Sequence, residues 1–167
     1  MGLGDETYVA PRSYDAALSA AGAVVTGVEA VLRGEVKNAF ALVRPPGHHA
    51  FSDHGEGFCV INDLAVAIRR LEKSGKITRA MTLDCDVHQG NGTAFIFDGD
   101  PSVFTFSMHG ERNYPTRKMR STLDVGLTDG IGDDEYLALL RRHLDGILAG
   151  FVPDIVFYLA GVDPVRG

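Results

Sequence analysis

The sequence has only two cysteines, few basic residues and no long apolar run, and each shortage excludes a class of protein. Cys59 and Cys85 are too few for a disulfide framework or a four-thiolate zinc site. The longest strongly apolar stretches, 39–43 and 155–160, fall far short of the roughly 18–20 residues that a spanning helix needs. Because no secretory signal is visible either, we expect a cytoplasmic protein that does not bind a membrane.

The charge balance favours some partners over others. The 167 residues contain 16 Lys and Arg against 22 Asp and Glu, which gives a formal net charge of −6. A chain of this charge, with a pI of about 5.4, is not expected to bind nucleic acid directly, whereas it suits a basic substrate. The composition is that of a globular protein, and the chain shows no linker or repeat, so we treat residues 1–167 as one domain.

Hydrophobic periodicity separates predicted helices from predicted strands. Apolar residues recur at helical spacing over 13–32, 64–73 and 135–148. The candidate N-caps of these three helices are Ser13, Asn62 or Asp63, and Asp133. Short, mostly apolar runs predict buried strands at 39–43, 80–83, 103–106 and 155–160, and residues 111–131 are predicted to be irregular. Strands that alternate with helices and lack a polar face indicate an α/β fold with a parallel sheet.

Polar side chains gather where the predicted strands end, which is where open parallel sheets bind ligands. Asp84, Asp86 and His88 follow one strand, and at that spacing an extended chain would turn all three side chains to the same face. Two carboxylates and an imidazole that lie so close favour a divalent cation, for which they are good ligands. Asp163, at the end of another strand, is well placed to complete a three-ligand site that leaves a position open for water.

Each of these residues also has a purely structural interpretation. An aspartate after a strand commonly caps a turn or a helix, and this applies to Asp163 taken alone. His48 and His49 follow Pro46-Gly47 and fit an ordinary loop equally well. Three ionisable residues that close a buried strand have few structural uses, so the metal interpretation is favoured for the segment 84–88.

Four blocks of the sequence stand out: RPPGHHA at 44–50, GFCVIND at 57–63, DCDVHQGNGT at 84–93 and AGVD at 160–163. In order and spacing they resemble the signature of the histone deacetylase superfamily, which includes the bacterial acetylpolyamine amidohydrolases. A stretch that contains Asn113-Tyr114-Pro115 is most similar to the class IV branch and its bacterial relatives. The resemblance covers nearly the whole chain. It implies part of a three-layer α/β/α domain with a mostly parallel sheet, as in arginases and deacetylases.

The resemblance also implies a metal-dependent deacetylase that hydrolyses the acetyl amide of acetyl-lysine, in a protein or peptide, or of an acetylated polyamine or other small amine. By similarity, Asp86, His88 and Asp163 bind Zn²⁺, with Fe²⁺ or Co²⁺ as alternatives that such a ligand set accepts. The tandem histidines His48 and His49 correspond to the pair that flanks the attacking water. Amide hydrolysis needs a general base and a general acid near pH 7, and we assign the base to His49.

Two further residues are expected behind the histidines. Asp84 corresponds to the carboxylate that orients His48, which acts as the electrostatic partner or proton donor. Asn91 takes the corresponding place behind His49. An amide cannot stabilise an imidazolium as a carboxylate does, so His49 is expected to stay neutral and available as a base.

The walls of the substrate channel and a second cation are also carried over from the resemblance. Phe58 corresponds to an aromatic wall of the acyl-lysine channel, and Tyr114 supplies part of the opposite rim. The resemblance also implies a structural K⁺ held mostly by backbone carbonyls, at positions that match Asp84, Asp86, His88 and Ser107. Asp5 or Glu6 is a weaker candidate for an acidic residue at the rim.

The sequence departs from the family pattern at its ends. Family members carry a Gly-rich loop whose tyrosine donates to the oxyanion, and none of the five tyrosines here has a Gly-Gly-Tyr context. We therefore expect a truncated piece of a deacetylase domain. The alternative function is a metal- or acyl-lysine-binding fragment without turnover. An uncovered sheet edge would also predict self-association, and a nucleotide-binding domain is disfavoured because no phosphate loop follows any predicted strand.

Overall fold

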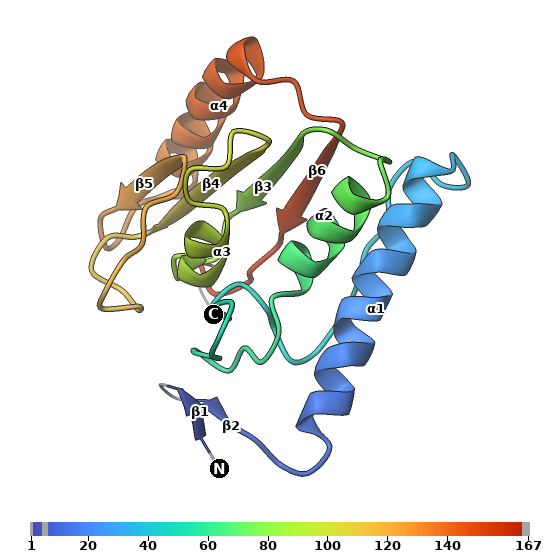
Figure 1. Ribbon diagram of the computed structural model, residues 1–167. Coiled ribbons are helices and arrows are strands. Elements are labelled where there is room, and N and C mark those ends of the chain that lie inside the picture. Colours follow the sequence, from blue (N-terminus) through green and yellow to red (C-terminus); the bar gives the residue numbers. More distant parts are fainter. Residues whose placement is uncertain (1, 5–6, 165–167) are drawn as a thin grey trace.

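The structure, a computed structural model, describes residues 2–4 and 7–164 (Figure 1). Its helices are α1 (Ser13–Leu32), α2 (Asp63–Lys73), α3 (Asn91–Ile96) and α4 (Asp133–Gly150). Its strands are β1 (Gly2–Gly4), β2 (Thr7–Tyr8), β3 (Ala80–Asp84), β4 (Val103–Gly110), β5 (Leu123–Leu127) and β6 (Ile155–Leu159). The candidate rim residues Asp5 and Glu6 lie outside the described residues.

A parallel sheet with the strand order β5-β4-β3-β6 forms the centre of the molecule. The register pairs Asp84, the last residue of β3, with Ser107 on β4 and Leu159 on β6. Because neighbouring strands run in the same direction, the segments that follow β3 and β6 leave the sheet at the same edge. The predicted parallel α/β fold is confirmed, and the edge that collects the polar residues is the carboxyl edge.

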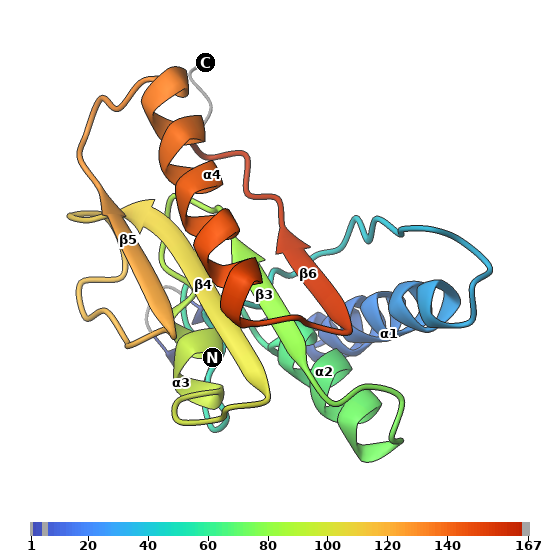
Figure 2. The ribbon, with the colours of Figure 1, turned by 90° about the horizontal axis from the view of Figure 1, so that it is seen from above.

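Helices cover both faces of this sheet, so the molecule has three layers (Figure 2). One core lies between the sheet and α1, α2 and α3, and it contains Ile68, Leu71 and Ala80. The other core lies under α4 and contains Met81 and Phe106. Adjacent residues Ala80 and Met81 thus enter different cores, because successive side chains of a strand point to opposite faces. This alternation explains why β3 is mostly apolar and has no polar face before Asp84.

The helix bounds agree with the predicted periodicity, but two of the predicted caps are wrong. Asn62 caps α2, since its Oδ1 accepts a hydrogen bond from the backbone N–H of Ala65 at 3.0 Å. At α1 the N-cap is Arg12, and the Ser13 hydroxyl instead accepts from the backbone N–H of Ala10. At α4 Asp133 is the first helical residue, where a carboxylate still interacts favourably with the helix dipole.

The predicted strand at 39–43 is wrong. This segment is irregular, belongs to neither sheet and exposes its large side chains, with Phe40 at 79% and Leu42 at 90% of full exposure. A strand needs a neighbour to satisfy its backbone groups, and none of the described strands lies alongside it. The apolar composition of the segment therefore does not suffice to make it a strand.

Two further differences concern the sheet itself. The stretch 111–131, which was predicted to be irregular, contains β5. This strand pairs in parallel with the C-terminal part of β4, from Phe106 to Gly110. The strand predicted to be buried at 155–160 is β6, which stands at the end of the sheet order and buries only part of its surface. Its Phe157 packs into the core under α2, whereas Val156 and Tyr158 are exposed.

One helix bears on the predicted absence of a membrane anchor. By length and composition alone α1 could cross a membrane, a property that the search for unbroken apolar runs misses because polar residues interrupt the helix. In this fold α1 packs on α2 as a covering helix. Glu29 of α1 lies 3.3 Å from Arg70 of α2 and 3.0 Å from Lys76, which follows α2.

Candidate active site

The residues after β3 fold into a hydrogen-bonded bend. The backbone N–H of Asp86 donates to Oδ1 of Asp84 at 3.0 Å, and the N–H of His88 donates to Oδ1 of Asp86 at 2.9 Å. The sequence predicted that Asp84, Asp86 and His88 would share one strand face. This prediction is wrong, because β3 ends at Asp84. Asp84 turns instead to His48, while Asp86 and His88 converge with Asp163.

A cluster of three side chains could hold a metal ion. Nδ1 of His88 lies 2.9 Å from Oδ1 of Asp86 and 3.2 Å from Oδ2 of Asp163, and one ligand atom of each residue lies within 4.8 Å of the others. Asp163 arrives from the segment after β6, where a side chain on Gly161 would collide with Asp86. Two carboxylate oxygens and one imidazole nitrogen are a donor set that suits a divalent cation with an open position.

The tandem histidines lie beside this cluster and are buried. Their ring centroids are 3.9 Å apart, and the residues are only 5% exposed for His48 and 4% exposed for His49. Nδ1 of His48 lies 2.9 Å from Oδ2 of Asp84, and Nδ1 of His49 lies 2.8 Å from Oδ1 of Asn91. The structure thus brings each histidine to the partner that the sequence predicted for it.

The pKa values of the two histidines are shifted in opposite directions. Burial disfavours the charged form of His48, but attraction to Asp84 and the hydrogen bond with it outweigh this effect, so the pKa of His48 is raised. Burial and repulsion by a charged His48 lower the pKa of His49 to about 3, although the bond with Asn91 opposes the shift. The pair therefore consists of one imidazole that binds a proton more readily than an ordinary histidine and one that is neutral at pH 7.

The two predicted channel residues lie in different settings. Phe58 has a φ of 66° and is 66% exposed. Tyr114 packs edge-on against the ring of His49, with centroids 5.0 Å apart, and stands 6.0 Å from that of His88. Tyr114 therefore lies directly against the histidines rather than only at a rim.

Sequence reasoning gave no role to two residues of the site, Glu56 and Gln89, although Gln89 lies within the matching block 84–93. Glu56 accepts a hydrogen bond from Nδ2 of Asn91 at 2.9 Å, although it lies outside the matching blocks. Gln89 is buried and exchanges hydrogen bonds with the backbone N–H and carbonyl of Met119, at 2.8 and 2.7 Å. Gln89 thus fastens the irregular segment that carries Tyr114 to the bend after β3.

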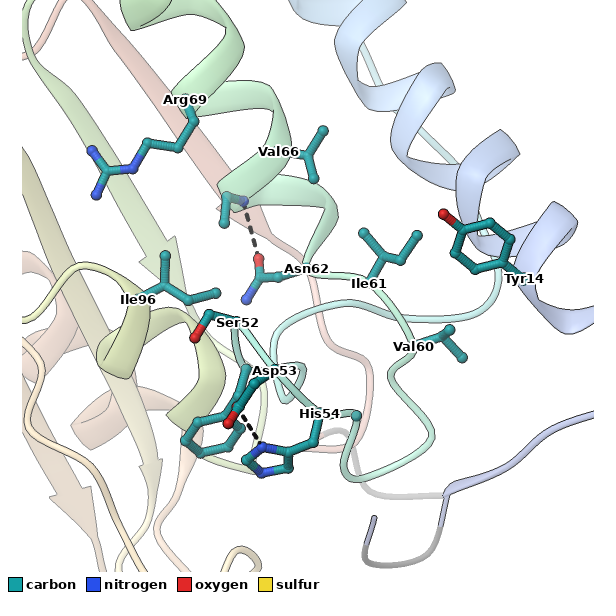
Figure 3. Close-up of a pocket in the computed structure, with 13 residues that line it drawn as sticks. Tyr14, Ser52, Asp53, His54, Val60, Ile61, Asn62, Val66, Arg69 and Ile96 are labelled. Carbon is teal, nitrogen blue, oxygen red and sulfur yellow. Dashed lines mark hydrogen bonds and ion pairs between the residues drawn. The ribbon is translucent and has the colours of Figure 1, made fainter. Parts of the chain in front are cut away.

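Two cavities flank the site. A cavity of about 1160 Å³ lies between α4 and the strand ends, and Cys85, Met108 and Asp163 are among its lining residues. A second cavity of about 540 Å³ lies between α2 and the loop 51–62 and has mostly apolar walls such as Val60 and Val66 (Figure 3). Of the three residues of the candidate metal cluster, Asp163 lines the larger of these two cavities, whereas Asp86 and His88 line neither.

Comparison with known proteins identifies close relatives of the whole described fold. A family model for the histone deacetylase domain matches residues 2–167. An uncharacterised protein of Picosynechococcus is 56% identical over 70% of this chain. The histone deacetylase-like amidohydrolase of Pseudomonas aeruginosa is 34% identical over 96% of the chain, and the polyamine deacetylase of Rattus norvegicus is 37% identical over 98%.

A solved structure shows the same arrangement. The crystal structure of the HDA15 HD domain matches all of this chain with a TM-score of 0.89 at 35% identity, while the chain covers 52% of that structure. The chain likewise spans 39%, 45% and 30% of the three relatives from Picosynechococcus, Pseudomonas and Rattus. The chain therefore spans about half of the solved structure and less than half of each of these three relatives.

Proposed function

This chain belongs to the histone deacetylase family, and from that premise we propose that it takes part in hydrolysing the acetyl amide of an acetylated amine. The observation that carries the proposal is the convergence of Asp86, His88 and Asp163 beside two buried histidines whose pKa values are shifted apart. Groups whose environments separate their pKa values are suited to act as a general acid and a general base.

The proposed cofactor is one divalent ion, Zn²⁺ first, held by Asp86, His88 and Asp163. When bound, such an ion supplies Lewis-acid polarisation of the acetyl carbonyl and makes water a better nucleophile. The donor set also accepts Fe²⁺ or Co²⁺, because two carboxylates and one imidazole discriminate weakly among these ions. A structural K⁺ near Ser107 remains a further proposal from the family resemblance.

His49 is proposed to remove the proton from the attacking water. Its pKa of about 3 leaves the ring neutral at pH 7, and the bond between its Nδ1 and Asn91 leaves Nε2 to accept the proton. His48, whose pKa is raised beside Asp84, is proposed to hold positive charge next to the reacting carbonyl and to donate a proton to the departing amine.

The proposed substrates are acetyl-lysine in a protein or peptide and acetylated polyamines or other small amines. A relative is named a polyamine deacetylase, and the net charge of −6 favours a cationic amine product or substrate. Phe58 and Tyr114 offer the aromatic surfaces that suit a methylene chain. The alternative function is binding of the metal or of an acyl-lysine without turnover.

Acetate release from an acetyl-lysine peptide and from an acetylated polyamine tests this proposal. We expect release that requires an added divalent ion and falls by about 10²–10⁴-fold in His49→Ala, since that is the typical contribution of a general base. The variant should retain its metal, because His49 is not in the cluster of Asp86, His88 and Asp163. Metal binding without release from either substrate would favour the alternative, and an unchanged rate in His49→Ala would exclude His49 as the base.

A further inference from the structure

Glu56 lies directly behind the asparagine that contacts His49. Asn91 is 1% exposed and uses both ends of its side-chain amide, since Oδ1 lies 2.8 Å from Nδ1 of His49 and Nδ2 donates to Oε2 of Glu56 at 2.9 Å. The Glu56 side chain is itself only 24% exposed. A continuous line of hydrogen bonds therefore runs from the His49 ring through the amide to a partly buried carboxylate.

The loop around Glu56 is built to hold that carboxylate in place. The backbone carbonyl of Glu56 accepts from the N–H of Cys59 at 2.8 Å, which closes a turn around Gly57. Gly57 has a φ of 52°, and a Cβ at this position would collide with the ring of His49. Only glycine combines this backbone conformation with so close an approach, so the turn fixes Glu56 relative to the histidine.

The other carboxylate oxygen faces a second histidine at the surface. Oε1 of Glu56 lies 3.5 Å from Nε2 of His54, whose Nδ1 lies 2.7 Å from Asp53. The Asp53–His54 pair is visible at the lower end of the smaller cavity (Figure 3). The Glu56 carboxylate thus lies between two partners. Oε1 faces His54 at the surface, and Oε2 accepts from the buried amide of Asn91.

The orientation of the Asn91 amide determines which ring nitrogen of neutral His49 carries the proton. An ionised carboxylate only accepts hydrogen bonds, so it requires the NH₂ end of Asn91 to face Glu56 and the carbonyl end to face His49. A carbonyl oxygen also only accepts, so Nδ1 of the neutral His49 ring must carry the proton. With the amide turned around, Nδ1 would have to accept, and Nε2 would carry the proton instead.

We propose that Glu56 is a positioning residue that orients the amide of Asn91 and thereby holds neutral His49 in the tautomer protonated at Nδ1. Nε2 of His49 is then free to accept a proton. The catalytic meaning of this tautomer rests on the proposed function, because it matters to hydrolysis only if His49 is the base. The tautomer itself is a property of this chain and is measurable without any turnover.

Long-range ¹H–¹⁵N spectra of the ¹⁵N-histidine-labelled chain at neutral pH, treated with a chelator, test the proposal. The signals of His49 are identified among the six histidines by their loss in His49→Gln. We expect Nδ1 protonated in the wild type and a roughly tenfold or larger fall in the ratio of Nδ1–H to Nε2–H forms in Glu56→Ala, the factor that a bond to a charged group typically contributes. Glu56→Met, which keeps the length of the side chain without the acceptor, should show the same fall if the alanine variant does not fold.

Two control variants separate positioning from a general disturbance of the loop. Asp53→Ala alters the same loop without touching Asn91, so the His49 tautomer should not change. In Asn91→Asp both side-chain oxygens accept, so Nδ1 should stay protonated with or without Glu56. An unchanged ratio in Glu56→Ala and Glu56→Met would overturn the inference. Absence of acetate release, in contrast, would count only against the proposed function.

Discussion

At the scale of single residues, His48 and His49 show how the group behind an imidazole decides its charge. The two rings are adjacent and similarly buried, yet Asp84 raises the pKa of one, and the other, bonded to an amide, has a pKa of about 3. A carboxylate stabilises an imidazolium at short range, whereas an amide does so only weakly and cannot offset the cost of burial. The difference follows from residues 84 and 91, both of which the sequence identified.

The lowered pKa of His49 predicts how stability depends on pH. The unfolded chain binds a proton at an ordinary histidine pKa near 6.5, whereas the folded chain binds it only near pH 3. Between these values unfolding takes up a proton, so this contribution to stability is complete above pH 6.5 and is lost as the pH falls. From pH 7 to pH 5 we expect His49 to cost at most about 2 kcal/mol of unfolding free energy.

Urea denaturation of the chelator-treated protein at pH 7 and pH 5 measures this loss. His49→Gln removes the titrating group, so its stability should fall less than that of the wild type between the two pH values. Equal falls in the two proteins would mean that His49 titrates normally in the folded state, contrary to its buried setting.

The metal cluster illustrates what spacing alone predicts at this scale. Asp86 and His88 converge with Asp163 as expected, but they do so through the bend after β3 and not through strand alternation. The type and order of the side chains could be read from the sequence. The hydrogen bonds that fold the bend, and the carboxylate of Glu56 behind Asn91, depend on the path of loops that no periodicity describes.

At the scale of elements, α2 depends on a single capping residue that also joins two other segments. Asn62 accepts from the backbone N–H of Ala65, and its Nδ2 lies 3.2 Å from the carbonyl of Ala50 and 3.0 Å from the hydroxyl of Thr93.

Asn62→Ala should lower the unfolding free energy by about 3 kcal/mol, because it removes one helix cap and two buried hydrogen bonds. Urea denaturation checks this value, with the exposed Asn38→Ala as the control. A loss below about 0.5 kcal/mol would contradict this role, since that is typical of an uninvolved surface site.

The strands show where local sequence stops being sufficient. Helix α1 was predicted to the residue, because its periodicity is a property of the helix alone. Segment 39–43 is as apolar as β6, yet it is not a strand, since a strand forms only beside another strand. Conversely, β5 contains Asp124 and Gly126, which weaken its pattern, and it forms through pairing with β4. Strand assignment therefore depended on neighbours that the sequence alone does not specify.

At the scale of the whole molecule, the side of β6 that faces away from α2 exposes two large apolar side chains at one end of the sheet. Val156 is 46% exposed and Tyr158 is 61% exposed, and β6 ends the described sheet. An uncovered apolar strand at a sheet edge is a template for association.

We expect this chain to self-associate in solution at micromolar concentrations, and Val156→Lys to shift it toward monomers. Sedimentation velocity checks this, with Val36→Lys as a control at similar exposure outside the sheet. Equal sedimentation of the two variants would exclude this face as the contact.

Metal stoichiometry, measured by elemental mass spectrometry on the monodisperse protein, tests the central claim most directly. We predict about one divalent ion per chain, lost in Asp86→Ala and kept in Asp98→Ala, which removes an exposed aspartate that is not part of the cluster. Loss only in the first variant would show that Asp86, His88 and Asp163 form a working metal site at the carboxyl edge of this sheet. No bound ion, or an ion that Asp86→Ala retains, would contradict the site and the hydrolysis proposed for it.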